Sequence, residues 1–273
     1  MFWYNGNLIE DKTIELAIDD PGLIYGATVF TTLRVYNNCL ESKLTNWHGH
    51  CQRLASSIKA FDWQEPDWER LRQGAEILVN TWPVLRIVIF ADGREWITGR
   101  LLPSNLEQKQ QEGVIVWLVD DSQFRRILPD RKTGNYLSAW LALQKAQKMG
   151  AAEAILIDEK GNWLETCTGN LWGWQDGHWW TPPVEAGILP GIMRSQLINH
   201  FQSHNKKVSQ EPWTVNLVKG FEAIVYTNSV VEVIPIQKII TQTLDLPLSQ
   251  YFTLEKSPEH IGLQQLRQFF TEI

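Results

Sequence analysis

Short apolar runs separated by turn residues fill the second half of the sequence, and they constrain its fold more than any other feature. The runs are residues 154–157, 163–164, 171–174, 179–181 and 223–227. Asp158–Gly161 and Asp176-Gly177 lie between them. Short runs bounded by Asp and Gly are typical of strands joined by tight turns. We therefore predict a β-rich C-terminal domain.

Helical patterns accompany these strands. Residues 136–149 form a helical segment that Gly150 ends in the position that glycine prefers. A second helix is predicted at 191–201, directly after Leu-Pro-Gly, and a last one from about Pro258. The C-terminal domain is therefore expected to carry helices on its strands.

The first half of the chain mixes both kinds of element. Asn5-Gly6 is a favoured two-residue hairpin turn between apolar pairs. The predicted strands are residues 28–36, 84–90 and 114–119, and the predicted amphipathic helices are 48–61 and 68–79. We predict an α+β protein with a smaller N-terminal α/β domain (1–119), a polar interdomain connector (120–130) and a larger C-terminal domain (131–273).

Charge and composition exclude several classes of function. The 273 residues carry a formal net charge of −6, which argues against general binding to nucleic acid or anionic membranes. The three cysteines are widely spaced, so neither a disulfide framework nor a cysteine metal site is predicted. The chain lacks a signal-peptide pattern and any apolar stretch near the roughly 20 residues of a membrane span, so a cytoplasmic protein is predicted. The 14 tryptophans favour packing over an aromatic ligand cage.

Two residues are candidates for chemistry, although each has an ordinary alternative. Lys132 precedes a predicted helix, where a lone lysine is normally solvated. Glu165 ends a bulky strand and precedes the small, polar stretch 166–170, so it is either a buried ligand contact or a surface glutamate. Neither residue is diagnostic alone.

A candidate anion site is more specific. Gly187–Arg194 runs into a helix whose first N–H groups favour a negative ligand, although Pro190-Gly191 is also a plain turn signal. Ser229 lies just after an apolar strand, and Arg53 on the first long helix would add positive charge. His48 and His50 point to different faces of a helix, so no metal site is predicted. From these residues alone we predict an anion-binding α/β enzyme.

In order, these motifs resemble the class IV aminotransferases, the fold type IV pyridoxal-phosphate enzymes. The resemblance covers nearly the whole chain, through residues 3–6, 19–26, 29–34, 50–54, 132–135, 153–158, 165–171, 181–183, 187–194 and 227–235. It implies pyridoxal 5′-phosphate as the cofactor and a homodimer as the assembly.

The resemblance also implies roles for individual residues. Lys132 matches the lysine that binds the cofactor covalently and then shuttles protons. Glu165 matches the carboxylate that hydrogen-bonds the pyridine nitrogen, and Leu189 matches the residue packed on the ring face. The residues matching the phosphate site are Arg53, Ile192, Met193 and Ser229. Tyr136 lies near the position of a tyrosine that reaches the ring hydroxyl.

The stretch Phe30-Thr-Thr32 bears on the reaction. Branched-chain aminotransferases usually carry Phe-Glu-Gly there, and D-amino-acid aminotransferases carry Glu-Val after the aromatic residue. The threonine pair resembles the aminodeoxychorismate lyases, which release pyruvate and form 4-aminobenzoate for folate biosynthesis. The alternatives are an aminotransferase for branched-chain or D-amino acids with a 2-oxo acid acceptor, and a catalytically silent cofactor-binding protein.

The substrate contacts are less defined than the cofactor contacts. Many family members carry Arg-Gly after the strand at 84–90, where this chain has Phe90-Ala-Asp-Gly93. The arginine that would bind a substrate carboxylate is therefore not identified by position. The substrate-binding candidates for this small-molecule substrate are Thr32, Tyr25, Arg94 and Arg100.

Overall fold

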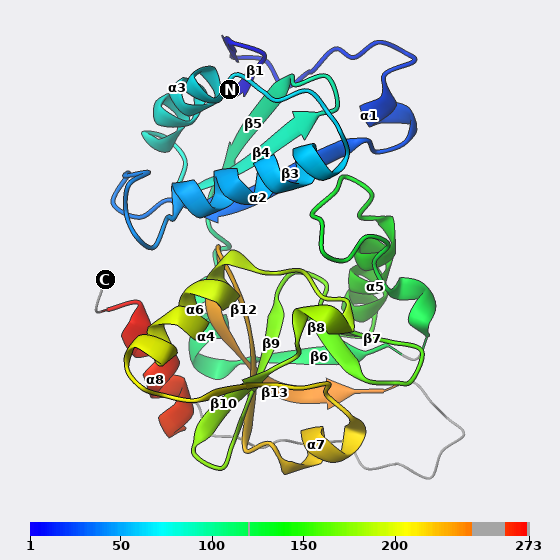
Figure 1. The fold of residues 1–273 in the computed structure, drawn as a ribbon, viewed down its shortest axis with the longest axis vertical. Coiled ribbons are helices and arrows are strands. Elements are labelled where there is room, and N and C mark those ends of the chain that lie inside the picture. The colour runs from blue at the N-terminus through cyan, green and yellow to red at the C-terminus, as the bar shows by residue number, and fades with distance from the viewer. Residues whose placement is uncertain (120, 242–259, 272–273) are drawn as a thin grey trace. The chain divides into compact units, whose positions relative to one another are not determined.

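The computed structural model describes residues 1–119, 121–241 and 260–271 and divides into two compact units (Figure 1). Unit 1 comprises Met1–Pro103 and Arg131–Asn135, and unit 2 comprises Ser104–Asp130 and Tyr136–Ile273.

These units do not coincide with the predicted segments 1–119, 120–130 and 131–273. Strand β6 (Val114–Leu118) pairs with strands of unit 2, which brings the residues around it into that unit. Residues 131–135 join unit 1 because their backbone pairs with its sheet. The first residue of the predicted connector, Asp120, lies outside the described residues.

Unit 1 contains a five-stranded antiparallel sheet in the order β2-β1-β5-β4-β3. Its strands are β1 (Phe2–Tyr4), β2 (Asn7–Ile9), β3 (Thr28–Arg34), β4 (Val84–Phe90) and β5 (Glu95–Arg100). The predicted hairpin is confirmed, because Asn5 and Gly6 join β1 to β2 with φ angles of 44° and 87°. Positive φ at both turn residues is what a type I′ hairpin requires.

One face of this sheet is covered by helices α2 (Trp47–Ala60) and α3 (Trp68–Val79), both as predicted (Figure 1). Val29 and Leu33 of β3 pack in the core formed with Leu54 and Leu71 of the helices. Burying one such aliphatic side chain stabilises the fold by about 1.5–3 kcal/mol. Because side chains alternate along a strand, Phe30 and its neighbours at even positions lie on the opposite face. The short helix α1 (Pro21–Ile24) precedes β3.

Unit 2 contains an eight-stranded sheet in the order β11-β10-β9-β12-β13-β6-β7-β8. Its further strands are β7 (Glu153–Ile157), β8 (Trp163–Thr166), β9 (Asn170–Gln175), β10 (His178–Thr181), β11 (Val208–Gln210), β12 (Ala223–Asn228) and β13 (Glu232–Ile240). Strand β8 also pairs with β9, so the order from β9 through β12, β13, β6 and β7 to β8 closes on itself. The predicted β-rich domain is therefore a sheet closed into a barrel-like ring.

Five α-helices and two 3₁₀ turns are described in unit 2. They are α4 (Leu106–Glu112), η1 (Ser122–Phe124), α5 (Leu137–Lys148), η2 (Val184–Ala186), α6 (Ile192–Ser203), α7 (Val215–Gly220) and α8 (Ile261–Phe269). Helices α5 and α6 confirm the predictions at 136–149 and 191–201. The predicted start of the last helix, Pro258, lies outside the described residues, and α8 begins at Ile261.

The tryptophans that cluster in β9 and β10 belong mainly to the core. Trp172, Trp174 and Trp179 are buried and contact one another edge to face, with ring centroids 6.4 and 5.3 Å apart. Edge-to-face contact is a favoured geometry for aromatic pairs. The prediction of packing is thus confirmed for these three rings.

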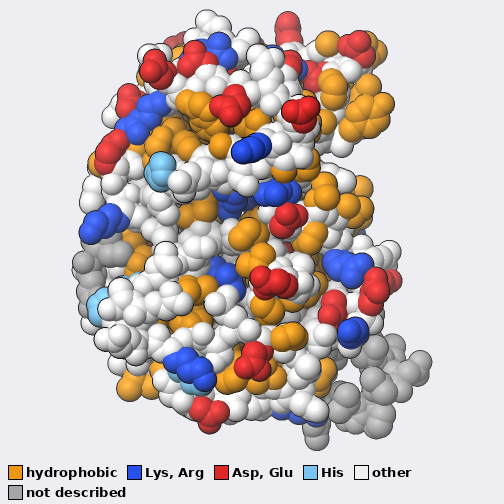
Figure 2. All heavy atoms as spheres, in the orientation of Figure 1, with side chains coloured by type: hydrophobic (Ala, Val, Ile, Leu, Met, Phe, Trp, Pro, Cys, Tyr) orange, Lys and Arg blue, Asp and Glu red, His pale blue; other side chains and the backbone are white. Residues whose placement is uncertain are grey.

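On the face shown in Figure 2, acidic and basic side chains are interspersed. Among the described helices, none is both long and apolar enough to cross a membrane. Within the same residues, no group of three or more His, Cys, Asp or Glu side chains could hold a metal ion.

Candidate functional site

Lys132 lies at the edge of the unit 1 sheet, against β3. The Phe30 N–H donates to the Lys132 carbonyl at 2.8 Å, and the Gly134 N–H donates to the Thr28 carbonyl at 2.7 Å. The Lys132 Nζ lies 4.7 Å from the centroid of the Phe30 ring. Backbone hydrogen bonds and an isolated bridge between Thr133 and Val29 therefore hold the segment that carries this lysine against β3, as a reactive amine requires for fixed geometry.

Gly134 allows this segment to approach β3 closely. A Cβ at this position would collide with the Thr28 Oγ1 and would lie 2.8 Å from the Gly26 carbonyl oxygen. Any larger residue would push residues 131–135 away from the strand, because the Gly26 contact is with backbone. The glycine in the pattern Lys-Thr-Gly-Asn is therefore explained by close packing against β3.

The face of β3 and β4 that carries Phe30 also carries a second cation. The Arg86 guanidinium carbon lies 3.7 Å from the centroid of the Phe30 ring. Thr32 is the cross-strand partner of Arg86, so the two side chains project from the same face. Phe30 thus contacts both Lys132 and Arg86, and Thr32 stands beside them in register.

Arg53 projects from α2 toward the opposite face of β3. Its Nη2 donates to the Thr31 Oγ1 at 2.6 Å, and that hydroxyl lies 2.5 Å from the His50 Nδ1. Burial, with the charges of Arg53 and Lys132, holds the pKa of His50 well below its usual value. The imidazole is therefore neutral, and its Nδ1 shares a hydrogen bond with the Thr31 hydroxyl.

Glu165, at the end of β8 in unit 2, is a buried carboxylate surrounded by hydrogen-bond donors. Arg126 Nη1 lies 3.0 Å from Oε1. The Leu189 N–H donates to Oε2 at 3.1 Å, and Asn170 Nδ2 lies 3.4 Å from the same oxygen. A carboxylate can be buried at this level because it is paired and hydrogen-bonded. The alternative of a surface glutamate is excluded.

Leu189 and the start of α6 lie next to this carboxylate. Asn170 Nδ2 also donates to the Leu189 carbonyl at 2.9 Å, so one amide side chain connects Glu165 to Leu189. The N-cap residue of α6 is Gly191, which provides no side-chain cap for the N–H groups that begin at Ile192 and Met193. A Cβ on Gly191 would collide with the Asn170 Oδ1, so a larger residue would force the Asn170 amide away from its contacts with Glu165 and Leu189.

Ser229 lies in the turn between β12 and β13, which the preceding residue shapes. Asn228 Oδ1 accepts the N–H groups of Val230 and Val231, each at 2.9 Å. The Asn228 Nδ2 donates to the Thr168 carbonyl at 3.2 Å. The turn that carries Ser229 is thus fastened to the β8–β9 connection.

Tyr136 precedes α5, and its hydroxyl donates to the Cys167 carbonyl in that same connection. Burial raises the pKa of Tyr136, so its hydroxyl stays protonated at neutral pH. The Tyr136 ring also faces the Arg126 guanidinium at 6.0 Å. Unit 2 therefore brings together Tyr136, Glu165 and Leu189 through Arg126 and Asn170.

Two of the substrate-binding candidates are solvent-exposed. Tyr25 directly follows α1 and exposes 75% of its surface. Arg100 ends β5, and its Nη1 donates to the Leu101 carbonyl at 3.3 Å.

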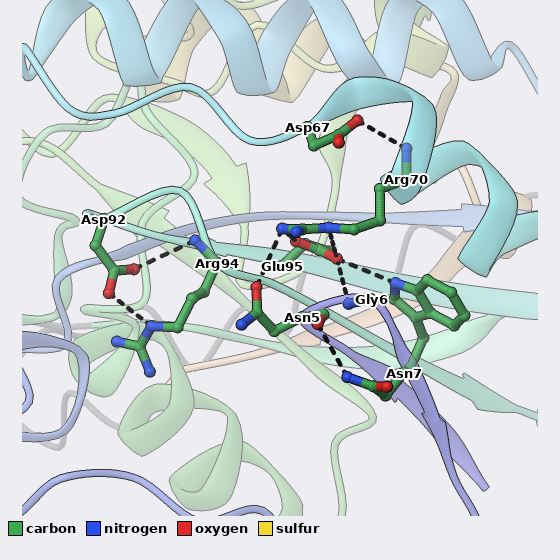
Figure 3. Close-up of polar contacts among 9 residues, drawn as sticks. Asn5, Gly6, Asn7, Asp67, Arg70, Asp92, Arg94 and Glu95 are labelled. Atoms are coloured by element: carbon green, nitrogen blue, oxygen red, sulfur yellow. Dashed lines mark hydrogen bonds and ion pairs between the residues drawn. The ribbon is translucent and has the colours of Figure 1, made fainter.

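Arg94, the third candidate, is engaged by other side chains of unit 1, of which Figure 3 shows Asp92. Its guanidinium donates to Asp92 Oδ2 at 2.6 Å, to Asp20 Oδ2 at 2.6 Å and to the Tyr4 hydroxyl at 2.7 Å. Two carboxylates already neutralise this cation, so it is poorly suited to a substrate carboxylate. Figure 3 also shows the adjacent buried Glu95, which Arg70 holds from α3.

Sequence reasoning missed Arg126, Asn170, Asn228 and Arg86. Arg126 lies in the polar segment predicted as a connector, and the local sequence does not show which of Arg125 and Arg126 is buried. Only the fold shows that Arg126 is buried while Arg125 lies at the surface. Arg86 carried a weak signal, since it is the one charged residue within the apolar strand 84–90.

The N-terminal antiparallel sheet and the closed C-terminal sheet define the fold of the fold type IV pyridoxal-phosphate enzymes. The family described as Amino-transferase class IV matches residues 28–239, and the chain belongs to this family. The family is one of pyridoxal-phosphate-dependent enzymes.

Curated relatives carry different activities in their names. A D-alanine aminotransferase of Bacillus licheniformis is 27% identical over 88% of this chain and 89% of its own length. An aminodeoxychorismate lyase of Bacillus subtilis is 25% identical over 88% of this chain and 86% of its own length. A branched-chain-amino-acid aminotransferase of Pseudomonas aeruginosa is 24% identical over 88% of this chain and 84% of its own length. These similarities do not separate the three activities.

Among solved structures, a hypothetical aminotransferase from Mycobacterium tuberculosis in its PLP-bound form superposes with a TM-score of 0.82. It is 19% identical, and the match covers 99% of this chain and 97% of that one. At this identity the likeness establishes the fold.

Proposed function

We propose that the chain is a pyridoxal-phosphate-dependent lyase that releases pyruvate from 4-amino-4-deoxychorismate and leaves 4-aminobenzoate. The observation that carries the proposal is the position of Thr32. It projects from the sheet face on which the Lys132 Nζ lies 4.7 Å from the Phe30 ring. A glycine there, as in the branched-chain pattern, would leave room for an aliphatic side chain. A threonine fills that space and offers a hydroxyl, which suits a polar ring substrate.

The residues present fit pyridoxal phosphate. Glu165 is a buried carboxylate whose neighbours are donors, so it would accept the pyridine N–H. The N–H groups that begin α6 have no side-chain cap, and they would hold the phosphate together with Arg53 and Ser229. Leu189 would pack on the ring, Tyr136 would contact the ring hydroxyl, and Lys132 would bind the cofactor covalently. When bound, the cofactor supplies an electron sink for charge that develops beside the substrate nitrogen.

Lys132 then moves the proton that the reaction requires. With its amine free of the cofactor, the Lys132 Nζ would remove the proton from the ring carbon that bears the amino group, and the C–O bond to the enolpyruvyl group on the neighbouring carbon would break. The ring becomes aromatic, and the released enol takes up a proton to become pyruvate. The step needs neither an oxidant nor an acceptor acid, because atoms and electrons balance within the substrate.

Arg86 is our candidate for binding a substrate carboxylate. It contacts the same Phe30 ring as Lys132 and stands opposite Thr32 in register. Arg94 is held by Asp20 and Asp92 and is therefore less suited to this role. A guanidinium offers a carboxylate two parallel N–H donors.

Aminotransferase activity is the second candidate, because relatives with that name are as similar to the chain as the lyase is. The purified protein, loaded with pyridoxal phosphate, would be supplied with 4-amino-4-deoxychorismate and separately with amino acids plus 2-oxoglutarate. Formation of 4-aminobenzoate and pyruvate in equal amounts without a 2-oxo acid supports the lyase. Turnover that depends on the 2-oxo acid, without 4-aminobenzoate, rejects it. Cofactor binding is judged by a visible absorbance band that the parent protein shows and Lys132→Ala lacks. A parent protein without this band would reject both the lyase and the aminotransferase.

We also propose that the chain forms homodimers. Large apolar side chains are exposed in both units, namely Leu23, Ile24 and Tyr25 in unit 1 and Ile127, Leu137 and Trp140 in unit 2. Exposed large apolar side chains that are close in sequence, as at residues 23–25, can mark a protein interface. Light scattering coupled to size exclusion would give twice the 31.5 kDa chain mass, and a monomer at micromolar concentration would contradict the proposal.

A further inference from the structure

We propose that Glu153 is a positioning residue that holds the turn Cys167–Gly169 and, through this turn, both Tyr136 and the segment that carries Ser229. The inference rests on the proposed function, because Tyr136 and Ser229 are the groups expected to contact the cofactor. Every residue in the chain of contacts belongs to unit 2.

Glu153 opens β7 and is almost completely buried. Its Oε2 accepts the Thr168 hydroxyl proton, and its Oε1 accepts the Ala154 N–H at 3.1 Å. Among the described residues, no lysine or arginine forms an ion pair with it. Burial accordingly raises the pKa of Glu153 to about 7. A buried carboxyl without a counter-ion is costly, so a purely structural need would be met more cheaply by an apolar residue.

The turn that Glu153 contacts is short and closed on itself. The Thr166 N–H donates to the Gly169 carbonyl at 2.8 Å, and the Gly169 N–H donates to the Thr166 Oγ1 at 3.0 Å. Its connection to β7 is completed by the Cys167 N–H, which donates to the Ala154 carbonyl at 3.0 Å. Glu153 thus provides a side-chain link between the turn and strand β7, next to a backbone link.

Two proposed cofactor contacts depend on the carbonyl groups of this turn. The Cys167 carbonyl accepts the Tyr136 hydroxyl proton, which fixes the orientation of that hydroxyl. The Thr168 carbonyl accepts from the Asn228 Nδ2, and Asn228 shapes the turn around Ser229. A rotation of the turn would therefore displace the ring-hydroxyl contact and the phosphate contact together.

In the described part of the chain, the titratable groups that interact with Glu153 are a thiol and two phenols. Cys167 lies within reach of its carboxyl, and burial with the nearby carboxylates raises the pKa of that thiol well above its usual value. Tyr136 and Tyr226 also feel the Glu153 charge, and burial keeps both phenols protonated at neutral pH. Glu153 is therefore the group in this cluster that titrates near neutrality.

Thr168→Val tests the link most cleanly. It removes the hydroxyl at a solvent-exposed position, keeps the side-chain shape and leaves Glu153 in place. Glu153→Ala removes the anchor, and Glu153→Gln keeps one acceptor oxygen. The matched control is Glu95→Gln in unit 1, an equally buried carboxylate whose partners include Arg70 and Trp3. Pyridoxal-phosphate dissociation constants and amide hydrogen exchange of the full chain, with and without cofactor, are measured for each variant.

We expect Thr168→Val to weaken cofactor binding about tenfold, which corresponds to about 1.4 kcal/mol, and to speed exchange at Val230 and Val231. In the parent protein, cofactor affinity should rise as the pH rises through about 7, and this step should be absent in Glu153→Gln. A cofactor dissociation constant of Thr168→Val within twofold of the parent value, with unchanged exchange at Val230 and Val231, would overturn the inference. This result is decisive even if Glu153→Ala fails to fold. If the parent protein binds no cofactor, the proposed function is wrong. The role of Glu153 is then still tested, because amide hydrogen exchange of the cofactor-free protein shows whether Glu153 holds the turn.

Discussion

Replacing Arg126 by methionine should destabilise the protein far more than the same change one residue earlier. Arg126 and Glu165 form an ion pair at 3.0 Å with side-chain exposures of 6% and 5%. Methionine keeps most of the side-chain volume but leaves the Glu165 carboxylate without its cation. Breaking a buried pair from one side costs about 3–5 kcal/mol. We expect a loss of that size in the free energy of unfolding at pH 8.

Arg125→Met is the matched control. Arg125 pairs with Glu159 at 2.8 Å, but the two side chains are 41% and 73% exposed. Exposed pairs of this kind contribute about 0–1 kcal/mol. The two variants therefore change the same residue type in neighbouring positions and differ in burial.

The Arg126→Met effect should also depend on pH. Without its cation, the buried Glu165 carboxyl favours the protonated form, so its pKa in the folded variant lies above the unfolded value of about 4.3. A group whose pKa is raised by folding loses stability as the pH rises. The difference from the parent protein should thus be smaller at pH 5 than at pH 8. Urea unfolding followed by tryptophan fluorescence measures both values, and equal losses below 1 kcal/mol in the two variants would refute the reasoning.

Three further predictions concern the two units. Thr31→Val removes the hydroxyl between Arg53 and His50 and leaves the buried Nδ1 unpaired, so unfolding should become easier by about 1–3 kcal/mol. The same change should weaken binding of pyridoxal phosphate more than binding of pyridoxal, and equal weakening in a binding titration would contradict the role of Arg53. Gly134→Ala should cost about 1–3 kcal/mol of overpacking in a denaturant titration, and unchanged stability would show that residues 131–135 do not approach β3 closely. Because burial raises the pKa of Glu153 to about 7, its protonated carboxyl stabilises the fold at acid pH, and up to about 3 kcal/mol of this stability is lost as the pH rises from 4.5 through 7. The free energy of unfolding of Glu153→Gln should lack this pH dependence. The same pH dependence in the variant and the parent protein would disprove the prediction.

Local patterns in the sequence predicted most of the elements but not their association. The apolar strand at 84–90 and the helix at 68–79 have bounds that match β4 and α3, because burial and capping act over a few residues. Strand β13 was not predicted, and it pairs with both β12 and β6. That pairing brings β6 into unit 2, so the boundary at residue 119 could not be read from local composition.

The candidate site was predicted by resemblance more than by chemistry. Glu165 and Lys132 are ordinary residues in their local sequence, and their roles follow from partners far along the chain. Glu165 meets Arg126, which is 39 residues away. Arg126 cannot be told from Arg125 by pattern. The assignment of Arg94 to the substrate was likewise made from proximity in sequence, whereas its pairing with Asp20 across 74 residues appears only in the fold.

The proposed function requires the cofactor to be attached to Lys132, and reductive trapping tests this attachment directly. The protein would be incubated with pyridoxal phosphate, treated with borohydride and digested, and its lysine peptides would be examined by mass spectrometry. We expect a phosphopyridoxyl group on the peptide that contains Lys132, and no label on that peptide in Lys132→Ala. Labelling that falls on other lysines, or that is unchanged in the variant, would contradict it.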